Sequence, residues 1–509
     1  MAFDLSNQLQ KSETAAFLTL CGVVLVICAI KWLSRLCSGA PGVHADSRKD
    51  DVLQGQGREG FKRFQLAFIA AYLAGMFSDW VQGPYLYRVY EAKNLPHGME
   101  SISHLYVSGY SAMAAASLIV APLADHFGRR ATCVLFCVLY SASCLLMLLD
   151  NFWLLLVGRL LSGMSVMILY NVFEAWMATE HLNRAYAPAL LMQTYVHMTA
   201  GNSLNAIVAS LAAWGAVHTT GDILAPFYLG ILALVVSGCI ICFSWGENHG
   251  RDEDSYELHH FWEMVRNALM VPLTDTRVAC VGVIQTCFDS ALYVFIFLWT
   301  PSLPPDTEVG ILFAAMMVAV GIGGHISSLF EHADGDTAHA DEHRAVITVP
   351  TCIYNTVLVC AYLLAGFASS KASRLAAILL QELCAGMHYT SFFNLRALTL
   401  PQQGRLTIQK LFHFPATVVT VAVLLTVKEH HLQEAKIRKM YFTLAGVAAV
   451  GMVSSAVLVA LDIGTITSQV RQAVRRVRKV MRHGGLAADE AAEPLMSPDE
   501  RHASAPRDQ

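Results

Sequence analysis

The stretch Leu123-Ala124-Asp125-His126-Phe127-Gly128-Arg129-Arg130 is a short charged connection between two long apolar segments, at about 101–124 and 131–149. Ionisable side chains are costly in hydrocarbon, so a cluster of them belongs at the membrane surface. Gly128 permits a tight turn at this point. The stretch therefore predicts a hairpin of two membrane helices whose connection lies at one face of the membrane.

The composition indicates that much of the chain faces something other than water. Of 509 residues, 55% are hydrophobic and only 15% are charged, whereas soluble proteins carry about a quarter. The net charge of −4 indicates no nucleic-acid partner. The cysteines lie mostly within apolar runs, and their spacing predicts neither a disulfide framework nor a metal site. We expect no cofactor.

Thirteen segments are long and apolar enough to span a membrane, which needs about 20 residues each. They are predicted at 14–34, 64–90, 101–124, 131–149, 152–178, 189–214, 223–245, 277–300, 308–330, 345–367, 373–396, 406–427 and 440–462. We therefore expect an all-α polytopic membrane protein. Its predicted parts are an accessory helix and polar linker (1–63), a six-helix bundle (64–245), an inter-bundle loop (246–276), a second six-helix bundle (277–465) and a tail (466–509).

Lys and Arg placement predicts the orientation. Basic residues cluster between the first two segments, in the charged connection and in the tail, so thirteen spans place all three in the cytoplasm and the N-terminus outside. Four basic residues argue against this orientation, because it places them outside the cell: Lys428, Lys436, Arg438 and Lys439. The first segment lacks a basic start and a small-residue cleavage site, which favours a retained helix. The basic start of the tail is expected to bind anionic membrane lipids, and its last two dozen residues are expected to be disordered.

Ionisable residues within the apolar segments are candidates for a transport pathway. In the second segment Pro84 cannot donate to the carbonyl of Trp80, so the helix is expected to break beside Asp79, Gln82 and Tyr85. Broken helices of this kind often line transporter sites. The alternative is a structural kink with Asp79 paired to a neighbouring helix.

Two further segments carry matching polar stripes at helical spacing. One holds Arg159, Gly163, Tyr170 and Glu174; the other holds Glu382, Gly386, Tyr389, Phe393 and Arg396. The repeat indicates two related halves with exchanged charge signs. Arg159 and Glu174 lie about 22 Å apart along a helix, so each needs another partner. The eighth segment adds Gln285 and Asp289 on one face. The structural alternative is that these charges pair across helices.

The charged connection resembles the signature loop of the major facilitator superfamily, Gly-x-Leu-Ala-Asp-Arg-x-Gly-Arg-Arg, with Ala121 for the first Gly and His126 for an Arg. The resemblance implies the major facilitator fold, and a gate on the inward side held shut by four residues of the loop. These are Asp125, Gly128, Arg129 and Arg130.

Further blocks narrow the resemblance to the molybdate-anion transporters, over roughly residues 60–465. They are Asp79-Trp-Val-Gln-Gly-Pro-Tyr85, Phe173-Glu-Ala-Trp176, Trp245-Gly-Glu-Asn248, Phe288-Asp-Ser290 and Phe297-Leu-Trp-Thr-Pro301. Membership implies import of molybdate, a tetrahedral oxyanion. The chain departs from the pattern at Asp289, where the family usually has Glu, and at His413, where it has Arg. Histidine is cationic only when protonated, so uptake through His413 should strengthen as pH falls.

The expected mechanism is alternating access between the two bundles, in the plasma membrane. Arg159 is the expected anion-facing cation, helped by Gln82, Tyr85, Gln285 and His413. Four carboxylates within the apolar segments are expected to orient cations, close gates or carry a coupling proton: Asp79, Glu174, Asp289 and Glu382. Two alternatives stay open, namely a transporter of an organic solute such as a sugar or amino acid, and a transport-inactive receptor or scaffold. The sequence contains no P-loop or nucleophile elbow, so no enzyme is expected.

Overall fold

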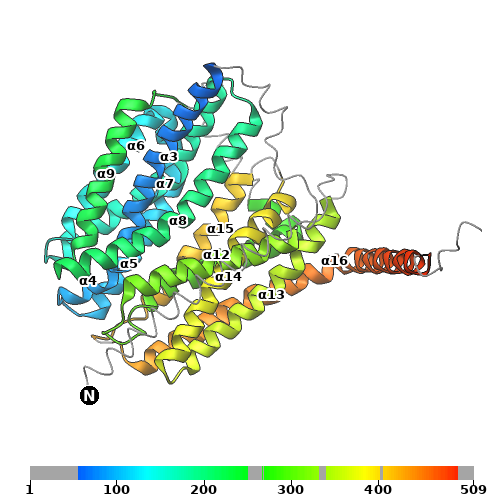
Figure 1. Cartoon of the computed structure of the whole chain (residues 1–509). Coiled ribbons are helices and arrows are strands. Elements are labelled where there is room, and N and C mark those ends of the chain that lie inside the picture. The colour runs from blue at the N-terminus through cyan, green and yellow to red at the C-terminus, as the bar shows by residue number, and fades with distance from the viewer. Residues whose placement is uncertain are drawn as a thin grey trace, which may run out of the picture.

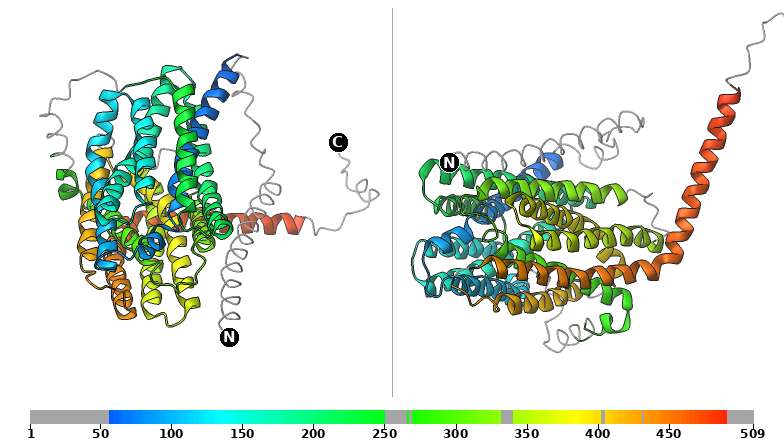
Figure 2. Two further views of the ribbon diagram at one scale, coloured as in Figure 1. Left: turned by 90° about the vertical axis from the view of Figure 1, so that its left-hand side faces the viewer. Right: turned by 90° about the horizontal axis from the view of Figure 1, so that it is seen from below.

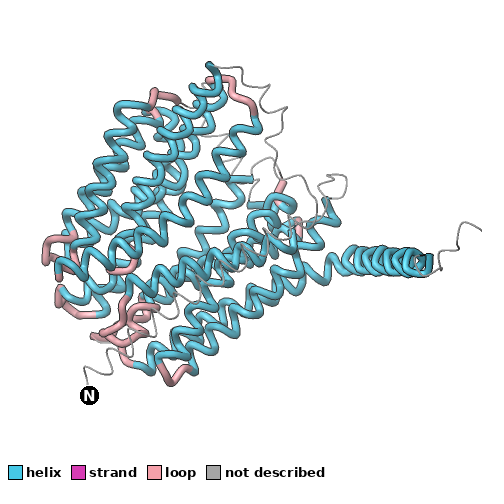
Figure 3. The backbone as a smooth tube through the Cα atoms, in the orientation of Figure 1, coloured by secondary structure: helices cyan, strands magenta, loops and turns pink. Residues whose placement is uncertain are grey.

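The computed structural model describes residues 56–249, 266, 269–331, 340–401, 405–430 and 432–490, and these are helical apart from short connections (Figure 3). The first half comprises α3 (Gln56–Gln82), α4 (Leu86–Ala92), α5 (Met99–Phe127), α6 (Arg129–Leu146), α7 (Phe152–Asn183), α8 (Pro188–Thr220) and α9 (Ala225–Ser244). The second half comprises α11 (Thr276–Leu298), α12 (Val309–Glu331), α13 (Ala340–Phe367), α14 (Lys371–Thr399), α15 (Arg405–Leu424) and α16 (Glu434–Glu490). The predicted accessory helix at 14–34 lies outside the described residues.

The helices form two bundles (Figure 1). In the first, α3 packs against α8 and α9, while α7 packs against α5 and α6. In the second, α13 packs against α14 and α16, and α11 packs against α15 and α16. The pairs α5–α15 and α8–α12 join the bundles. The order of packing repeats between the halves, which matches the repeated polar stripes of the sequence.

Nine helices of the described part are long and apolar enough to cross a membrane. The remaining long helices, α8, α14 and α15, do not meet that criterion. Polar side chains such as Gln381, Glu382 and His388 lower the hydropathy of α14, and the described side chains of α15 leave only a shorter apolar stretch, Leu411–Leu424. Burial within the bundle makes such residues tolerable, since Gln381, Glu382 and His388 are all buried.

Outward-facing apolar side chains show where lipid is expected. On α6, Leu135, Val138 and Leu145 are exposed, whereas Cys133 and Tyr140 on the opposite face are buried. An exposed apolar face of this kind is typical of a helix that contacts lipid or another protein rather than water. The same pattern recurs around both bundles, so the exposed surface of this helical body suits a hydrocarbon environment.

The second predicted segment is broken where Pro84 predicted it. Helix α3 ends at Gln82, a turn follows, and the short helix α4 begins at Leu86. The amide of Tyr85 donates to the carbonyl of Gln82 at 3.1 Å, which stabilises the turn. The predicted single span at 64–90 is therefore two helices, because Pro84 has no N–H to continue the first.

The last helix extends well beyond the bundle. Helix α16 continues to Glu490, and its C-terminal part projects away from the other helices (Figure 2). The basic start of the tail is therefore helical, and the residues after Glu490, where disorder is predicted, lie outside the described residues.

Candidate functional site

The two ends of the molecule differ in how the bundles meet. We call the end that carries residues 123–130 the loop end, and the opposite one the seal end. Contacts between the bundles gather at the seal end: the Tyr110 hydroxyl donates to the Tyr293 carbonyl at 3.0 Å, and the Met99 amide donates to the His430 carbonyl at 3.0 Å. From there the bundles diverge toward the loop end (Figure 1).

Four aromatic residues form what we call the interbundle seal: Tyr106 and Tyr110 of α5, and Tyr293 and Phe297 of α11. The Tyr110 and Tyr293 rings stack with centroids 4.9 Å apart, and Tyr106 meets Phe297 edge-on at 5.3 Å. Aromatic pairs in such geometries contribute beyond their buried area. The seal therefore closes the space between α5 and α11 at the seal end.

Polar contacts reinforce closure on both sides of the seal. Arg88 donates to the carbonyl of Pro304 at 3.1 Å, and the Trp214 indole donates to Glu308 at 3.0 Å. Gly310 permits the second contact, because a Cβ there would lie 2.7 Å from the Cβ of Trp214. Both contacts join the first bundle to the second.

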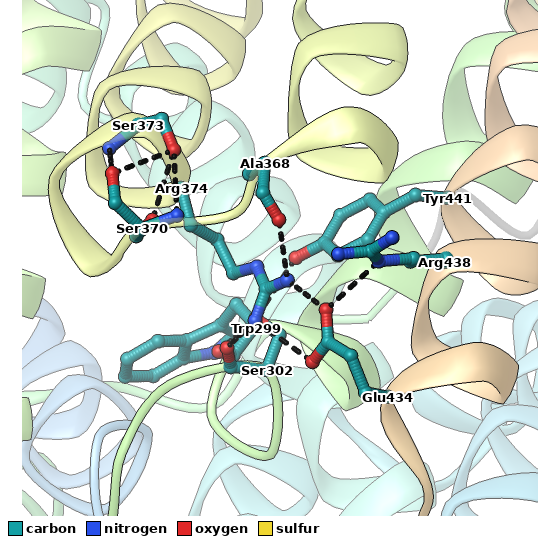
Figure 4. Close-up of polar contacts among 9 residues, drawn as sticks. All are labelled: Trp299, Ser302, Ala368, Ser370, Ser373, Arg374, Glu434, Arg438 and Tyr441. Carbon is teal, nitrogen blue, oxygen red and sulfur yellow. Dashed lines mark hydrogen bonds and ion pairs between the residues drawn. The ribbon is translucent and has the colours of Figure 1, made fainter.

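A polar network holds the seal end of the second bundle together (Figure 4). Arg374, near the start of α14, donates to the Ser302 carbonyl at 2.7 Å and the Ala368 carbonyl at 3.2 Å, and it pairs with Glu434 of α16. The Ser302 hydroxyl contacts that of Tyr441 at 3.0 Å. One cation thus connects α14, α16, the residue that follows α13 and the loop that follows the Phe297–Pro301 block.

At the loop end, three of the sequence blocks meet in one network, which we call the loop-end network. Arg129 pairs with Asp125 at 2.8 Å and donates to the Ala175 carbonyl at 3.2 Å and to Thr179. The carboxylate of Glu247 accepts the backbone N–H groups of Arg130 and Ala131 at 2.8 and 3.1 Å. A carboxylate at a helix N-terminus satisfies free N–H groups and the helix dipole.

The conformation of Gly128 makes the loop-end network possible. Its φ is +103°, and a Cβ there would lie 2.6 Å from the Glu247 carboxyl carbon. Trp176 and Trp245 stack with centroids 3.7 Å apart and planes inclined by 10°, and the Trp176 indole donates to the Gly246 carbonyl at 2.9 Å. These contacts of the predicted gating residues lie within the first bundle.

Arg159 lies near the seal end rather than midway along the bundle. It is seven residues from the start of α7, which is about 10 Å. Its guanidinium donates to the Leu105 carbonyl at 3.4 Å and to Ser162 at 3.2 Å, and lies over the Tyr106 ring at 5.6 Å. Gly109 makes room for it, since a Cβ there would lie 2.6 Å from Nη2. Arg159 is thus packed directly behind the interbundle seal.

The predicted group of Asp79, Gln82 and Tyr85 is spread over different partners. Asp79 accepts a hydrogen bond of 2.5 Å from Tyr140 of α6. Gln82 is buried against Gly230 of α9 and donates to the Ser78 carbonyl at 2.6 Å. Tyr85 is buried in the core at the seal end. The structure does not bring these three to one surface.

Midway along the helices, side chains of both bundles face one another while staying accessible. Tyr170 of α7 and Tyr389 of α14 are 42% and 54% exposed. Polar groups of both bundles lie near Tyr170, namely Asp79 and Tyr72 in the first and Tyr293 and Tyr389 in the second. Glu174 is also exposed, and Tyr195 of α8 hydrogen-bonds to it. We call this face, from Tyr170 and Tyr389 toward the loop end, the interbundle surface.

In the second bundle a chain of polar contacts connects α14, α11 and α15. Arg396 donates to Gln285 Oε1 at 3.4 Å, and Gln285 Nε2 lies 3.0 Å from His413 Nε2. His413 Nδ1 lies 2.9 Å from Asp289 Oδ2, at ion-pair distance but outside hydrogen-bond alignment. The structure therefore brings the predicted residues Gln285, Asp289 and His413 together. Arg396 was not among the predicted pathway residues, although its place in the stripe of α14 was visible.

Glu382 is buried in α14, near the place where α14 approaches α12 most closely. A Cβ on Gly386 would lie 1.9 Å from the Val320 carbonyl, and one on Gly163 would lie 2.4 Å from the Gly109 carbonyl. The two glycines that the sequence repeat aligned thus make equivalent close approaches in the two bundles. Among the described residues, no group of three or more His, Cys, Asp or Glu side chains is placed to hold a metal ion.

Two bundles of long apolar helices, in contact at one end and carrying a charged connection at the other, define a transporter of the major facilitator type. A family model described as sugar transporters with twelve transmembrane segments matches residues 43–393. The chain is 32% identical to the molybdate-anion transporter of Xenopus tropicalis, over 74% of this chain and 82% of that protein. The molybdate-anion transporter of Danio rerio is 30% identical, over 70% and 77%. The chain therefore belongs to the molybdate-anion transporter family.

A solved structure agrees on the fold. The POT family transporter PepTSo superposes with a TM-score of 0.58 at 13% sequence identity, covering 80% of this chain and 99% of that one. The relatives and the structural neighbour are transporters rather than enzymes. The chain is accordingly a multi-pass membrane protein with a transporter fold.

Proposed function

We propose that this protein is a secondary transporter that imports molybdate, or a closely related tetrahedral oxyanion, by alternating access between its two bundles. Membership of the molybdate-anion transporter family carries this proposal. The arrangement of the bundles supports it, because contacts such as that of Tyr110 with Tyr293 lie at the seal end while the interbundle surface stays accessible. This is the arrangement of a carrier that is open on one side only.

If the loop end is cytoplasmic, as the Lys and Arg distribution predicts, the bundles open toward the interior of the cell. The structure would then represent the state that releases substrate into the cell, in the plasma membrane, with the N-terminus outside and the C-terminus inside. Two of the four basic residues that argued against this topology have acidic partners at the seal end: Lys436 lies 3.2 Å from Glu429, and Arg438 lies 3.2 Å from Glu434.

In this proposal the predicted residues act at different points between the loop end and the seal end. Tyr170, Glu174 and His413 belong to the interbundle surface, where the substrate leaves, and the buried Gln285 and Asp289 lie beside His413. Arg159 lies behind the seal and would meet the anion when the seal end is open. The four signature residues would hold the loop end shut in that opposite state. Glu382 would act as a buried carboxyl within the second bundle.

Import of a dianion needs coupling to another ion. An inside-negative potential opposes entry by about 2.3 kcal/mol per charge per 100 mV, and so by about twice that for a dianion. His413 and Asp289, 2.9 Å apart, are placed to accept a proton together. We propose that a proton enters with the anion through this pair. Protonation of His413 adds positive charge, which should strengthen anion binding as pH falls.

One observation favours the organic-solute alternative, because the matching family model is described as sugar transporters. The accessible rings of Tyr170 and Tyr389 would suit a sugar as well as an anion. Competition distinguishes the two substrates: tungstate and sulfate should inhibit molybdate uptake, whereas a panel of sugars and amino acids should not.

The test is molybdate accumulation in a host that lacks high-affinity uptake of its own. We expect saturable uptake by the intact chain, and loss of uptake in Arg159→Ala at equal surface expression. A correctly inserted protein that admits no molybdate would overturn the proposal. Saturable uptake of an organic solute by that protein would then support the second candidate, and no saturable uptake at all would support a receptor or scaffold.

A further inference from the structure

Arg396 has more hydrogen-bond donors than partners. It lies in α14, three residues from the loop end of that helix, and it is half-buried. Its one hydrogen bond within the described part of the chain is the long one to Gln285, at 3.4 Å, and its guanidinium also lies over the Phe392 ring at 5.4 Å. A guanidinium has five N–H donors. None of its nitrogens is among the buried, partnerless atoms of the described residues, so its remaining donors meet water.

The neighbours of Arg396 are polar as well. Gln285 Nε2 can only donate, so His413 Nε2 accepts from it and His413 Nδ1 carries the proton that faces Asp289. The guanidinium and the imidazole are separated by a single amide, which places both within reach of one small anion. Asp289 supplies an opposing negative charge, because it faces His413 at 2.9 Å and lies near enough to Arg396 to act on it.

From this arrangement we infer that Arg396, Gln285 and His413 form the binding site for a tetrahedral oxyanion on the interbundle surface, with Arg396 as its permanent cation. The inference rests on the proposed function and adds a residue and a location to it. A guanidinium presents a planar fork of donors that matches two oxygens of an oxyanion. An anion would replace the long bond from Arg396 to a neutral amide oxygen with shorter, charge-assisted bonds.

The site is distinct from Arg159. Arg159 is about 10 Å from the seal end of α7, whereas Arg396 is 25 residues, or about 37 Å, from the seal end of α14. A small oxyanion bound to Arg396 therefore does not touch Arg159, whose donors are directed at Leu105 and Ser162. Arg396 is the cation that is accessible in the state the structure represents, and Arg159 is the one placed to act on the other side.

The experiment measures binding of radiolabelled molybdate to the full-length protein in nanodiscs, beside its uptake in cells. Arg396→Gln should weaken binding about tenfold or more, as expected for loss of a charged hydrogen bond. Arg396→Lys, which keeps the charge without the fork, should weaken it less. Arg438→Gln is the matched control, because it removes one positive charge at the seal end and should leave binding unchanged.

A second variant keeps the test decisive if Arg396→Gln does not fold, as judged by its melting temperature. Gln285→Glu preserves shape but adds a negative charge beside Arg396, and it should abolish binding. Unchanged affinity in a folded Arg396→Gln or Gln285→Glu variant, with uptake intact in the natural protein, would overturn this inference alone. An absence of molybdate uptake by the natural protein would overturn the proposed function, and this inference with it.

Discussion

The close approach of α12 and α14 predicts that a Gly→Ala substitution lowers thermal stability more where the added methyl group lies closer to the neighbouring helix. A Cβ at Gly386 would lie 1.9 Å from the Val320 carbonyl oxygen, 1.5 Å short of the 3.4 Å at which ordinary contact begins. The obstacle is backbone, so the two helices must move apart. Overpacking of this kind costs about 1–3 kcal/mol or more. Gly386→Ala should therefore lower the melting temperature by on the order of 5 °C.

Two further glycines complete the series. Gly163→Ala meets the Gly109 carbonyl at 2.4 Å and should destabilise less than Gly386→Ala. Gly446→Ala meets nothing within 4 Å and is the matched control; it should leave stability unchanged or raise it slightly, because alanine favours helix. The assay is thermal unfolding of detergent-solubilised protein followed by size-exclusion fluorescence. Equal melting temperatures for Gly386→Ala and Gly446→Ala would refute the reasoning.

Three other predictions concern the seal, the loop end and the proton. Tyr110→Phe removes an interbundle hydrogen bond worth about 0.5–1.5 kcal/mol. It should therefore shift spin-label distances across the seal end toward the values of the open state. Tyr228→Phe, on an exposed face of α9, is the control and should leave these distances unchanged. Glu247→Gln weakens the cap on α6 and should cost about 1 kcal/mol in thermal unfolding; an unchanged midpoint would contradict that role. His413→Gln should remove the strengthening of uptake at low pH, whereas His197→Gln, at an exposed position of α8, should keep it.

Much of the helical framework could be predicted from local sequence. The apolar segment at 101–124 corresponds to α5, and Pro84 sets the end of α3. The repeat of Gly163 and Gly386 also corresponds to a physical feature, because both positions are too close to a neighbouring backbone for a side chain. Predictions of this kind rest on hydropathy and on residue types, such as Gly and Pro, that a particular backbone geometry requires.

The arrangement of the site could not be predicted in the same way. Asp79 and Gln82 are three residues apart, yet one turns to Tyr140 of α6 and the other to Gly230 of α9, and helical spacing cannot choose between such partners. The seal depends on Tyr110 meeting Tyr293, which are 183 residues apart. The place of Arg396 beside Gln285 likewise depends on how α14 and α11 pack.

The stacked tryptophans at the loop end provide an optical probe that needs no label. Trp176 and Trp245, with centroids 3.7 Å apart, are close enough for their indole transitions to couple and to produce a paired band in circular dichroism. Both belong to the first bundle, one in α7 and the other directly after α9. If the bundles rock as rigid bodies, this band should stay constant through the transport cycle. A band that changes when substrate is added would instead reveal bending within the bundle.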